Sequence, residues 1–373
     1  MVIPEKWAKK QLSDIVAMKS GETITAERIF DNAEYPCYGG NGLRGYTDKY
    51  THEGDFALVG RQGALCGNVN YANGRFYASE HAVVVTPYNN TDIRFMYYLL
   101  TAMNLNQYAT SSAQPGLAVN KILELECVVP ESKAEQQAIS EALTEIDNLI
   151  STQEALIAKK QAIKQGAMQE LLTGKRRLAG FVDKWCRHKL ENVVDFCTSS
   201  VRLKDIDVKE YIGTDNMLSN LGGVKDNELC LQYSTVREYK KKDILISNIR
   251  PYLQKAWFAN RHGGCSNDVL VFRSKDERKY MPLFLYFLLT DGRFFDYATE
   301  TATGSKMPRG DKEMIKVYEL YLPDKIEEQQ AIADTLDDMS ADIANQQAKL
   351  EKLRRIKSGM MDKLLTGKIR LTD

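Results

Sequence analysis

The sequence predicts a mixed α/β protein, in which two globular α/β domains are separated by a two-helix antiparallel coiled coil with an internal pseudo-two-fold duplication. Three observations predict this fold class. The chain contains a long internal repeat, each copy of the repeat carries apolar residues at heptad spacing, and each copy changes from acidic in its first half to basic in its second.

The repeat joins residues 128–180 to residues 321–373 at a constant offset of 193, and about 22 of the 53 pairs are identical. The upstream segments match more faintly: Trp7 recurs as Trp185, and FMYYLL at 95–100 resembles FLYFLL at 284–289. A repeat of this length indicates one structural unit used twice. The predicted division is a first domain at 1–130, a helix at 131–180, a second domain at 181–323 and a helix at 324–373.

Each repeat has the pattern of one long helix. A capping box is expected at each start, Ser132 with Glu135 and Asp324 with Glu327. About 40 helical residues would span about 60 Å. Heptad spacing predicts that the two helices pair, with Gln153 and Gln346 as polar seam positions that fix the register. The expected apolar seam is Ile139, Leu143, Ile146, Ile150, Leu156, Ile157 and Ile163, and in the second copy Ile332, Leu336, Met339, Ile343, Leu350 and Leu353.

Charge predicts the relative direction of the two helices. Residues 131–154 carry a net charge of −5 and 155–178 carry +5, while 324–347 carry −6 and 348–371 carry +6. In a parallel pair, like charges would face each other along the interface. An antiparallel pair brings acidic halves against basic halves, and the small pairwise energies then share one sign. The sequence therefore predicts an antiparallel coiled coil.

Each helix is expected to end in the phrase LLTGK, at 171–175 and 364–368. A phosphate-binding loop would need G-x-x-x-x-G-K-[ST], and neither copy fits it. Gly174 and Gly367 instead suit the left-handed position that ends helices. The Lys and Arg residues that follow suit the negative end of the helix dipole.

The two globular halves combine short strands with turn clusters. FALVG, HAVVV, DILIS and DVLVF are expected strands, and helices are expected at about 92–104 and 281–291. Gly40, Gly42 and Gly45 spell the dinucleotide fingerprint G-x-G-x-x-G. No apolar strand precedes them and no helix pattern follows, so the segment is interpreted as a loop.

Composition limits the class of protein. The net charge is zero, so any surface that binds nucleic acid must be a local patch. Seven scattered cysteines without a C-x-x-C pair indicate reduced thiols, a cytoplasmic location and no zinc site, and no cofactor is expected. No apolar run is long enough for a membrane span.

With these residues in view, the chain resembles the specificity subunits of type I restriction-modification systems. The likeness covers nearly the whole sequence. It rests on the duplicated P…EQQAI…L…LLTGKxRL helix and on phrases within the two domains, among them YGGNGLRGY, GRQGALCGNV and SAQPGLAVN in the first and DILISNIRPYLQKAWFA, CSNDVLVF and GSKMPRGD in the second.

The resemblance implies a subunit without a catalytic centre. Two target-recognition domains would each read one half of a bipartite sequence in double-stranded DNA, and the helical spacer would set the gap between the halves. The implied partners are two adenine-methylating modification subunits, together with restriction subunits for translocation and cleavage. Because the two domains differ in sequence, the two half-sites should differ as well.

Candidate DNA contacts are polar and cationic residues in the loops of the two domains. Arg and Lys suit guanine or phosphate, and Asn and Gln suit adenine. SAQPGLAVN and GSKMPRGD are equivalent in place, each shortly before its spacer helix. The candidates are Arg44, Tyr46, Arg61, Gln62, Gln114 and Asn120 in the first domain, and Asn248, Arg250, Tyr252, Lys255, Ser305, Lys306 and Arg309 in the second. For any single one, a solvated or turn-stabilising side chain is the competing interpretation, as a satisfied half-buried histidine is for His81.

Two other functions compete with DNA recognition. A methyltransferase acting alone would need a cofactor-binding domain and an N/D-P-P-[YF] motif, and neither occurs in the sequence. A scaffold that organises other proteins through its coiled coil would not bind DNA. The spacer helices are also expected to carry the subunit contacts, with Lys164 and Lys357 on faces available to a partner.

Overall fold

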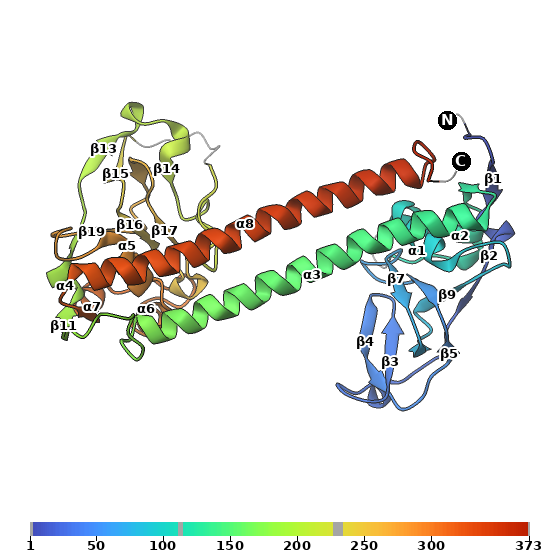
Figure 1. Ribbon diagram of the computed structural model, residues 1–373, viewed down its shortest axis with the longest axis horizontal. Helices are drawn as coiled ribbons and strands as arrows, with labels where there is room; N and C mark the ends of the chain where they lie inside the picture. The colour runs from blue at the N-terminus through green and yellow to red at the C-terminus, as the bar shows by residue number, and fades with distance from the viewer. Residues whose placement is uncertain (1–2, 111–114, 227–233, 372–373) are drawn as a thin grey trace. The chain divides into compact units, whose positions relative to one another are not determined.

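The computed structural model describes residues 3–110, 115–226 and 234–371. The chain packs as two compact units, unit 1 formed by residues 1–155 and 347–373 and unit 2 by residues 156–346. Two 39-residue helices, α3 (Lys133–Leu171) and α8 (Ile326–Leu364), each contribute one part to unit 1 and the other to unit 2. Figure 1 shows both helices along their full length.

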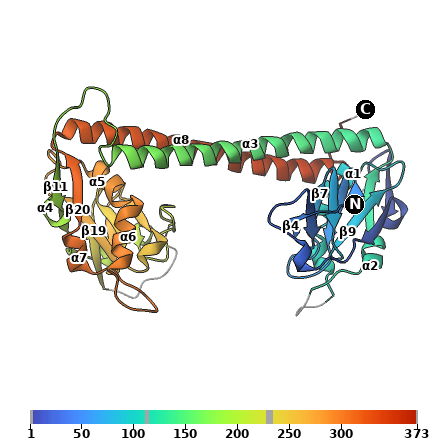
Figure 2. The same cartoon turned by 90° about the horizontal axis from the view of Figure 1, so that it is seen from below.

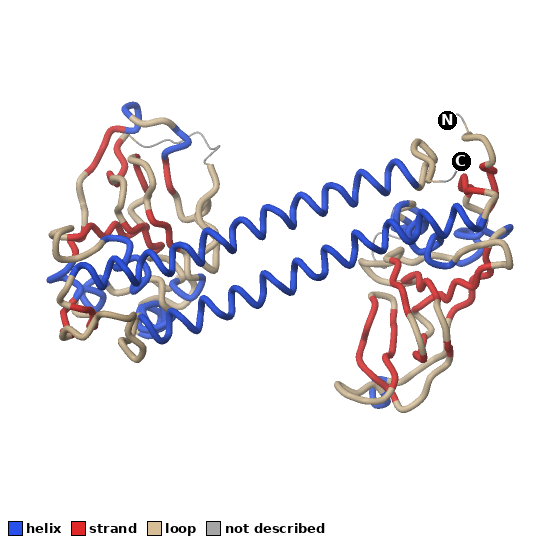
Figure 3. Tube along the Cα trace, in the orientation of Figure 1, coloured by secondary structure: helices blue, strands red, loops and turns tan. Residues whose placement is uncertain are grey.

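Unit 1 contains the first globular α/β region, and Figure 3 separates its strands from its helices by colour. A two-stranded sheet β1-β10 and two four-stranded sheets, in the orders β2-β9-β6-β7 and β4-β3-β8-β5, form the β structure. The elements are β1 (Trp7–Gln11), β2 (Val16–Ser20), β3 (Tyr35–Gly39), β4 (Gly42–Thr47), β5 (His52–Glu53), β6 (Phe56–Gly60), β7 (Val69–Ala72), β8 (Arg75–Ala78), β9 (Ala82–Pro87), α1 (Ile93–Ala102), α2 (Val119–Leu123) and β10 (Glu126–Pro130).

Unit 2 contains the second globular α/β region. Its sheets are β11-β20, β12-β19-β16-β17 and β13-β15-β18-β14. The elements are β11 (Trp185–Lys189), α4 (Leu190–Val193), β12 (Val194–Phe196), β13 (Ser200–Arg202), β14 (Tyr211–Ile212), β15 (Thr235–Tyr239), β16 (Ile244–Ser247), β17 (Ala256–Phe258), β18 (Gly263–Cys265), β19 (Val269–Ser274), α5 (Pro282–Leu289), α6 (Gly292–Glu300), α7 (Lys312–Lys316) and β20 (Glu319–Pro323).

The predicted duplication is confirmed by sheet pairing inside each unit. β1 pairs antiparallel with β10 and places Trp7 opposite Pro130, and β11 pairs with β20 and places Trp185 opposite Pro323. The sheets β2-β9-β6-β7 and β12-β19-β16-β17 share one order, and all their strand pairs are antiparallel. The third sheets differ, because β3 and β8 are parallel whereas β15 and β18 are antiparallel.

The predicted strands and helices of the globular halves are also confirmed. FALVG, HAVVV, DILIS and DVLVF form the cores of β6, β9, β16 and β19, and α1 and α5 lie where the Tyr, Phe and Leu-rich helices were expected. The G-x-G-x-x-G segment is not the loop that was expected, because β3 precedes it and Gly42 and Gly45 belong to β4 of the β3–β4 hairpin. β4 is followed by β5 rather than by a helix, so the segment does not have the strand–turn–helix context of the dinucleotide fingerprint.

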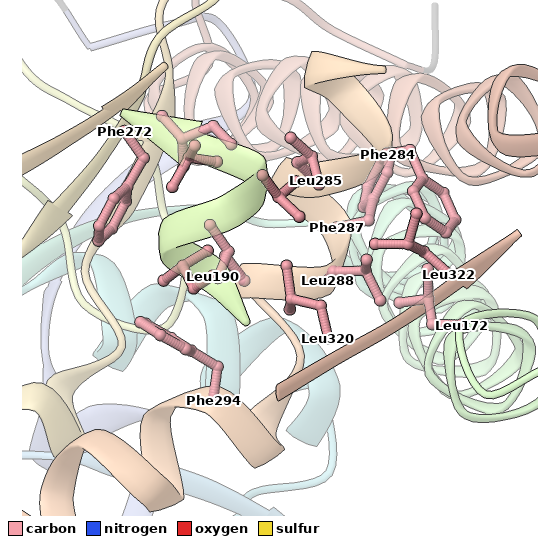
Figure 4. Close-up of a cluster of buried hydrophobic side chains, with 14 of the residues drawn as sticks. Leu172, Leu190, Phe272, Phe284, Leu285, Phe287, Leu288, Phe294, Leu320 and Leu322 are labelled. Carbon is pink, nitrogen blue, oxygen red and sulfur yellow. The ribbon is translucent and has the colours of Figure 1, made fainter. Parts of the chain in front are cut away.

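The main core of unit 2 joins α5 to the end of α3 and the start of α8. Figure 4 shows Phe284, Leu285 and Leu288 of α5 among side chains from other elements, including Leu172 after the end of α3 and Leu322 of β20. Phe284 and Leu285 are fully buried. An almost wholly apolar helix such as α5 is stable only when it is covered on all sides. The core therefore fixes the spacer helices against the globular region.

The antiparallel direction of the helices is confirmed by ion pairs within each unit. In unit 1, Lys357 Nζ lies 2.7 Å from Asp147 Oδ1, and Arg354 Nη2 lies 2.8 Å from Glu154 Oε1. In unit 2, Lys160 Nζ lies 2.5 Å from Asp342 Oδ2, and this hydrogen bond lowers the pKa of Asp342. Basic second halves thus meet acidic first halves, and the α3 and α8 segments run side by side in both Figure 1 and Figure 2.

Most of the predicted seam is buried, including Ile139, Leu143, Ile332 and Leu336. Ile150, Met339 and Leu353 are half-buried. Two predicted seam residues are exposed: Leu156 is 38% exposed and Ile163 is 53% exposed. The 3.5-residue period explains the error. Continuing the heptad from Gln153 gives Ile157, Lys160 and Lys164 as the next seam positions. The aliphatic stems of the two lysines therefore fill the part of the seam where Ile163 was expected.

Each helix start is held by a buried glutamate rather than by a capping box. In unit 1 the carboxylate of Glu135, 1% exposed, accepts hydrogen bonds from Trp7 Nε1 at 3.2 Å and from Arg370 Nη2 at 2.8 Å. The guanidinium therefore comes from the tail that follows α8. We call Trp7, Glu135 and Arg370 the unit 1 clasp.

Unit 2 repeats the arrangement with Trp185, Glu328 and Arg177. Glu328 is fully buried, and its carboxylate accepts hydrogen bonds from Trp185 Nε1 at 3.3 Å and Arg177 Nη2 at 2.6 Å. The predicted capping partner Glu327 is exposed instead. EQQAI and LLTGKxR are thus complementary motifs, since the glutamate of each EQQAI meets the arginine of the other repeat.

The first glutamine of each EQQAI ties the helix to its globular region. Gln136 accepts a hydrogen bond from Asp92 N at 2.8 Å and donates to Pro130 O at 2.9 Å. Gln329 accepts from Met281 N at 2.9 Å and donates to Pro323 O at 2.9 Å. Both glutamines are buried, so these bonds satisfy polar groups that water cannot reach.

The predicted helix ends are confirmed. α3 ends at Leu171 and α8 at Leu364, and Gly174 and Gly367 follow with φ of 69° and 67°. The left-handed glycine reverses the chain direction at the end of the helix. Gly367 then lies so close to the Trp7 ring that a Cβ at this position would be 3.2 Å from it. The turn delivers Arg177 and Arg370 to the clasps.

We expect Arg370→Ala to destabilise unit 1 by about 3 kcal/mol, because it leaves the carboxylate of Glu135 buried without its cationic partner. Chemical denaturation of the purified chain measures the loss. The control is Arg278→Ala, whose side chain is 94% exposed and whose removal should cost less than about 0.5 kcal/mol. Equal effects for the two variants would contradict a structural role for the clasp.

Candidate nucleic-acid interface

In unit 1, three loop segments meet at the end of β6. Arg61 N donates to His81 O at 2.9 Å, which joins the end of β6 to the turn before β9. Leu117 N donates to Arg61 O and Gly63 N donates to Pro115 O, both at 2.9 Å, which adds the loop before α2. We call this arrangement of residues 61–63, 79–81 and 115–117 the unit 1 junction.

Unit 2 contains the same hydrogen bonds at the end of β16. Asn248 N donates to Asp268 O at 2.8 Å, Gly310 N to Asn248 O at 3.1 Å, and Arg250 N to Pro308 O at 2.8 Å. Residues 248–250, 266–268 and 308–310 form the unit 2 junction. In unit 1 the loop before α2 thus pairs with the end of β6, and in unit 2 the loop before α7 pairs with the end of β16.

The two junctions share a backbone but not their side chains. The hydrogen bonds make Arg61 equivalent to Asn248, Gly63 to Arg250 and His81 to Asp268. Isolated bridges between Gln62 and Gly116 and between Ile249 and Arg309 complete the correspondence. Main-chain hydrogen bonds do not depend on the side chain, so such a frame tolerates different residues at each position.

A hollow of about 440 Å³ adjoins the unit 1 junction, lined by Gly40, Asn41, Arg44, Gln62, Gly63 and His81. The hairpin turn lies close against the end of β6, because a Cβ on Gly60 would come within 1.9 Å of Gly40 O. The aliphatic part of the Arg44 side chain lies over Gly39. Nitrogen donors from three loops therefore meet at one surface.

A hollow of about 230 Å³ adjoins the unit 2 junction, lined by Tyr211, Thr235, Val236, Cys265, Ser266, Asn267 and Asp268. Burial raises the pKa of the Cys265 thiol to about 12, so this thiol is neutral. The Arg309 guanidinium lies 3.2 Å from Asp268 Oδ1 at the edge of the same turn. This surface presents a carboxylate, hydroxyls and an amide, in contrast to the hollow of unit 1.

The structure brings together several of the candidates predicted in the first domain. Arg44 and Gln62 line one hollow, and Arg61 lies beside them with Nη1 donating to Ser20 Oγ at 3.2 Å. Tyr46 is half-buried within β4, and Asn120 is exposed on α2. Gln114 lies outside the described residues.

Three candidates of the second domain, Asn248, Arg250 and Arg309, belong to the unit 2 junction. Asn248 is 6% exposed, and its buried Oδ1 has no hydrogen-bond partner among the described residues. Arg250 is exposed and has a φ of 52°, a left-handed conformation that costs a non-glycine residue energy and is concentrated at functional sites. Lys255 is turned inwards, with Nζ donating to Thr214 O at 2.7 Å. Tyr252, Ser305, Lys306 and Arg309 are exposed.

Sequence reasoning missed two residues of the junctions. His81 is half-buried and paired with Glu80, as its interpretation as a satisfied histidine required, but it also lines the unit 1 hollow. Asp268 was treated only as the start of a strand. The available signal was the alignment of SEHAVVV with SNDVLVF, which places these two residues at the same position.

Among the described residues, no group of three or more His, Cys, Asp or Glu side chains could hold a metal ion. No helix in the described ranges is long and apolar enough to cross a membrane.

Comparison with known proteins defines the family of the chain. The family described as the type I restriction modification DNA specificity domain matches residues 4–164 and again 184–355. The two matches together cover most of the chain and follow its duplication. The chain belongs to this family.

Individual relatives agree with that assignment. A type I restriction enzyme EcoprrI specificity subunit of Escherichia coli is 49% identical over 148 residues, which are 39% of this chain and 37% of that relative. A putative type I restriction enzyme specificity subunit of Haemophilus influenzae is 24% identical over 326 residues, 81% of this chain and 79% of the relative. The 49% identity is thus confined to somewhat less than two fifths of each protein.

Solved structures support the fold. A type I restriction-modification S subunit from M. genitalium matches with a TM-score of 0.69 at 16% identity, covering 97% of this chain and 96% of that one. A chain from a structure of the assembly and conformational transition of the type I R-M system matches with a TM-score of 0.57 at 13% identity, covering 99% of this chain and all of that one. Two α/β regions with paired long helices are therefore the fold of this family.

Two glycines test the packing of the unit 1 junction. We expect Gly60→Ala to destabilise unit 1 by about 1–3 kcal/mol, because its Cβ would meet the carbonyl oxygen of Gly40 and force the hairpin turn away. Gly116→Ala is the matched control, since the nearest atom to its Cβ would be Arg61 O at 3.8 Å. Thermal unfolding of both variants measures the difference, and equal midpoints would contradict the close approach of the hairpin turn.

Proposed function

We propose that this chain is the non-catalytic DNA sequence-specificity subunit of a type I restriction-modification complex. Each recognition domain reads one half of a bipartite target in double-stranded DNA, and the coiled coil sets the gap and docks the methyltransferase subunits. One observation carries the proposal: the two junctions have the same main-chain hydrogen bonds but different side chains. Such a pair suits two half-sites of different sequence.

The side chains at the junctions support DNA contact. Arg44 and Gln62 in the first domain, and Arg250 and Arg309 in the second, carry the donors that pair with guanine and adenine edges in the major groove. Lys306 and Tyr252 are exposed nearby and suit phosphate and sugar contacts. These residues, with Tyr46, Arg61, Asn120, Asn248, Lys255 and Ser305, remain the proposed contact set.

The helices support the role of a spacer. Each has 39 residues, about 58 Å at 1.5 Å per residue, or about 17 base pairs of B-DNA. Ion pairs along the helices and a clasp in each unit hold the two helices in register. A rod of fixed register converts helix length into a fixed distance along the duplex.

The partners proposed are two modification subunits, joined by restriction subunits for cleavage, in the cytoplasm and without a cofactor of this chain's own. Lys164 and Lys357 were expected on faces available to a partner, but both side chains pack against other residues of the chain. Lys357 pairs with Asp147, and burial lowers the pKa of Lys164, whose Nζ lies 5.6 Å from the centre of the Phe287 ring. Leu156 and Ile163, exposed one heptad apart on α3, are better candidates for a partner helix.

DNA binding tests the proposal. We expect the chain assembled with modification subunits to bind a bipartite duplex with an affinity that falls steeply as salt rises. Arg250→Ala should weaken binding by about 1–3 kcal/mol, roughly 5- to 150-fold, since it removes a base or phosphate contact. Fluorescence anisotropy at several salt concentrations measures both, with Arg278→Ala as the control. Methylation of DNA by the purified chain alone would overturn the proposal.

Spacer length tests the setting of the gap. Seven residues inserted after Ala155 and seven after Gln347 preserve the heptad in both helices and add about 10.5 Å, close to three base pairs. The methylated motif should keep both half-sites and gain about two to three base pairs between them. Mapping N6-methyladenine in cells that express the assembled complex measures the gap. An active variant with an unchanged gap would contradict the spacer role.

A further inference from the structure

His81 and Asp268 hold the same place in the two junctions. The carbonyl oxygen of each accepts the amide hydrogen of the first residue after the central strand, at 2.9 Å from Arg61 N and 2.8 Å from Asn248 N. That structural role belongs to the backbone and is met by any residue. The two side chains are therefore free of it, and they are 40% and 37% exposed. An imidazole in one unit and a carboxylate in the other give the two surfaces different chemistry.

Each of the two residues also belongs to a pair of a carboxylate and a nitrogen donor. In unit 1, His81 Nε2 lies 3.1 Å from Glu80 Oε1, while Glu80 Oε2 accepts a hydrogen bond from Ile24 N at 3.3 Å. In unit 2, Asp268 Oδ1 lies 3.2 Å from Arg309 Nη2. The carboxylate fixes the direction of the donor, as carboxylates fix imidazole and guanidinium groups elsewhere in proteins.

We propose that His81 and Asp268 are specificity-determining residues for the two half-sites. With Nε2 held by Glu80, His81 presents Nδ1 and the ring edge to a base of the half-site read by unit 1. Asp268 is a positioning residue: it holds one nitrogen of Arg309 and leaves the remaining donors for O6 and N7 of a guanine in the other half-site. The inference rests on the proposed function and adds which residues discriminate between bases.

The competing interpretation is that both pairs only stabilise the fold. Both pairs are partly exposed to water, and exposed ion pairs contribute little to stability. His81 lines the hollow that contains Arg44 and Gln62, and Asp268 lines the hollow of unit 2. A pair that only stabilised the fold would not need to line a hollow. The junctions are also already held together by main-chain hydrogen bonds, without either side-chain pair.

Base selection by the assembled complex tests the inference. The variants are His81→Ala, with His81→Gln in case the first fails to fold, Asp268→Asn and Arg309→Lys. Two readouts are needed: the N6-methyladenine motif in cells, and binding by the purified complex to duplexes that carry each single base change. We expect His81→Ala to lose roughly 5- to 150-fold of discrimination at one base pair of one half-site.

Asp268→Asn should relax discrimination at one base pair of the other half-site, the same base pair that Arg309→Lys relaxes. Lys49→Ala and Arg278→Ala, exposed residues of units 1 and 2, are controls that should leave both half-sites unchanged. The ratio between cognate and altered duplexes is the deciding quantity, because a structural defect lowers affinity for all duplexes alike.

Three outcomes would overturn the inference: unchanged discrimination, an equal loss of affinity for every duplex, or effects of His81→Ala and Asp268→Asn in the same half-site. Failure of the proposed function looks different, because the unaltered complex would then select no bipartite sequence at all. A wild-type complex with a clear bipartite motif and insensitive variants leaves the proposed function standing and removes only the inference.

Discussion

The rest of the structure depends on one interaction made in each unit: a buried glutamate at the start of one long helix pairs with an arginine that follows the other long helix. Glu135 and Glu328 are almost without solvent contact, and an unpaired carboxylate there would cost several kcal/mol. Arg370 and Arg177 remove that cost only if each helix tail reaches the start of the other helix. The clasp therefore selects the antiparallel pairing by penalising the alternatives, a stronger constraint than the exposed ion pairs along the helices supply.

A fixed frame allows the proposed recognition surface to vary. The clasps and the glutamine bonds use side chains that are alike in both units, and they hold each globular region against the helices. The junctions use main-chain hydrogen bonds, which leave Arg61 and Asn248, or His81 and Asp268, free to differ. Shared geometry and different chemistry thus lie on different parts of the chain, as the proposed reading of two different half-sites requires.

Much of the fold could be predicted from sequence because duplication, heptad spacing and charge each act along the chain. The helix ends at Gly174 and Gly367 followed from local backbone chemistry. The clasp could not be predicted, since Glu135 and Arg370 are 235 residues apart and each also fits a local explanation as a cap or a dipole partner. Arg44 and Gln62 could be named, but their meeting with His81 depends on three loops that only the folded chain brings together.

The division of the chain into units has a consequence for synthesis on the ribosome. Unit 2 is continuous, residues 156–346, and can fold once that stretch has emerged. Unit 1 needs residues 347–373 as well, and its clasp waits for Arg370, which follows Glu135 by 235 residues. Domains usually fold in the order of their synthesis. Here the globular region of unit 1 emerges before unit 2 but is completed after it, and until then the start of α3 carries a glutamate without its cationic partner.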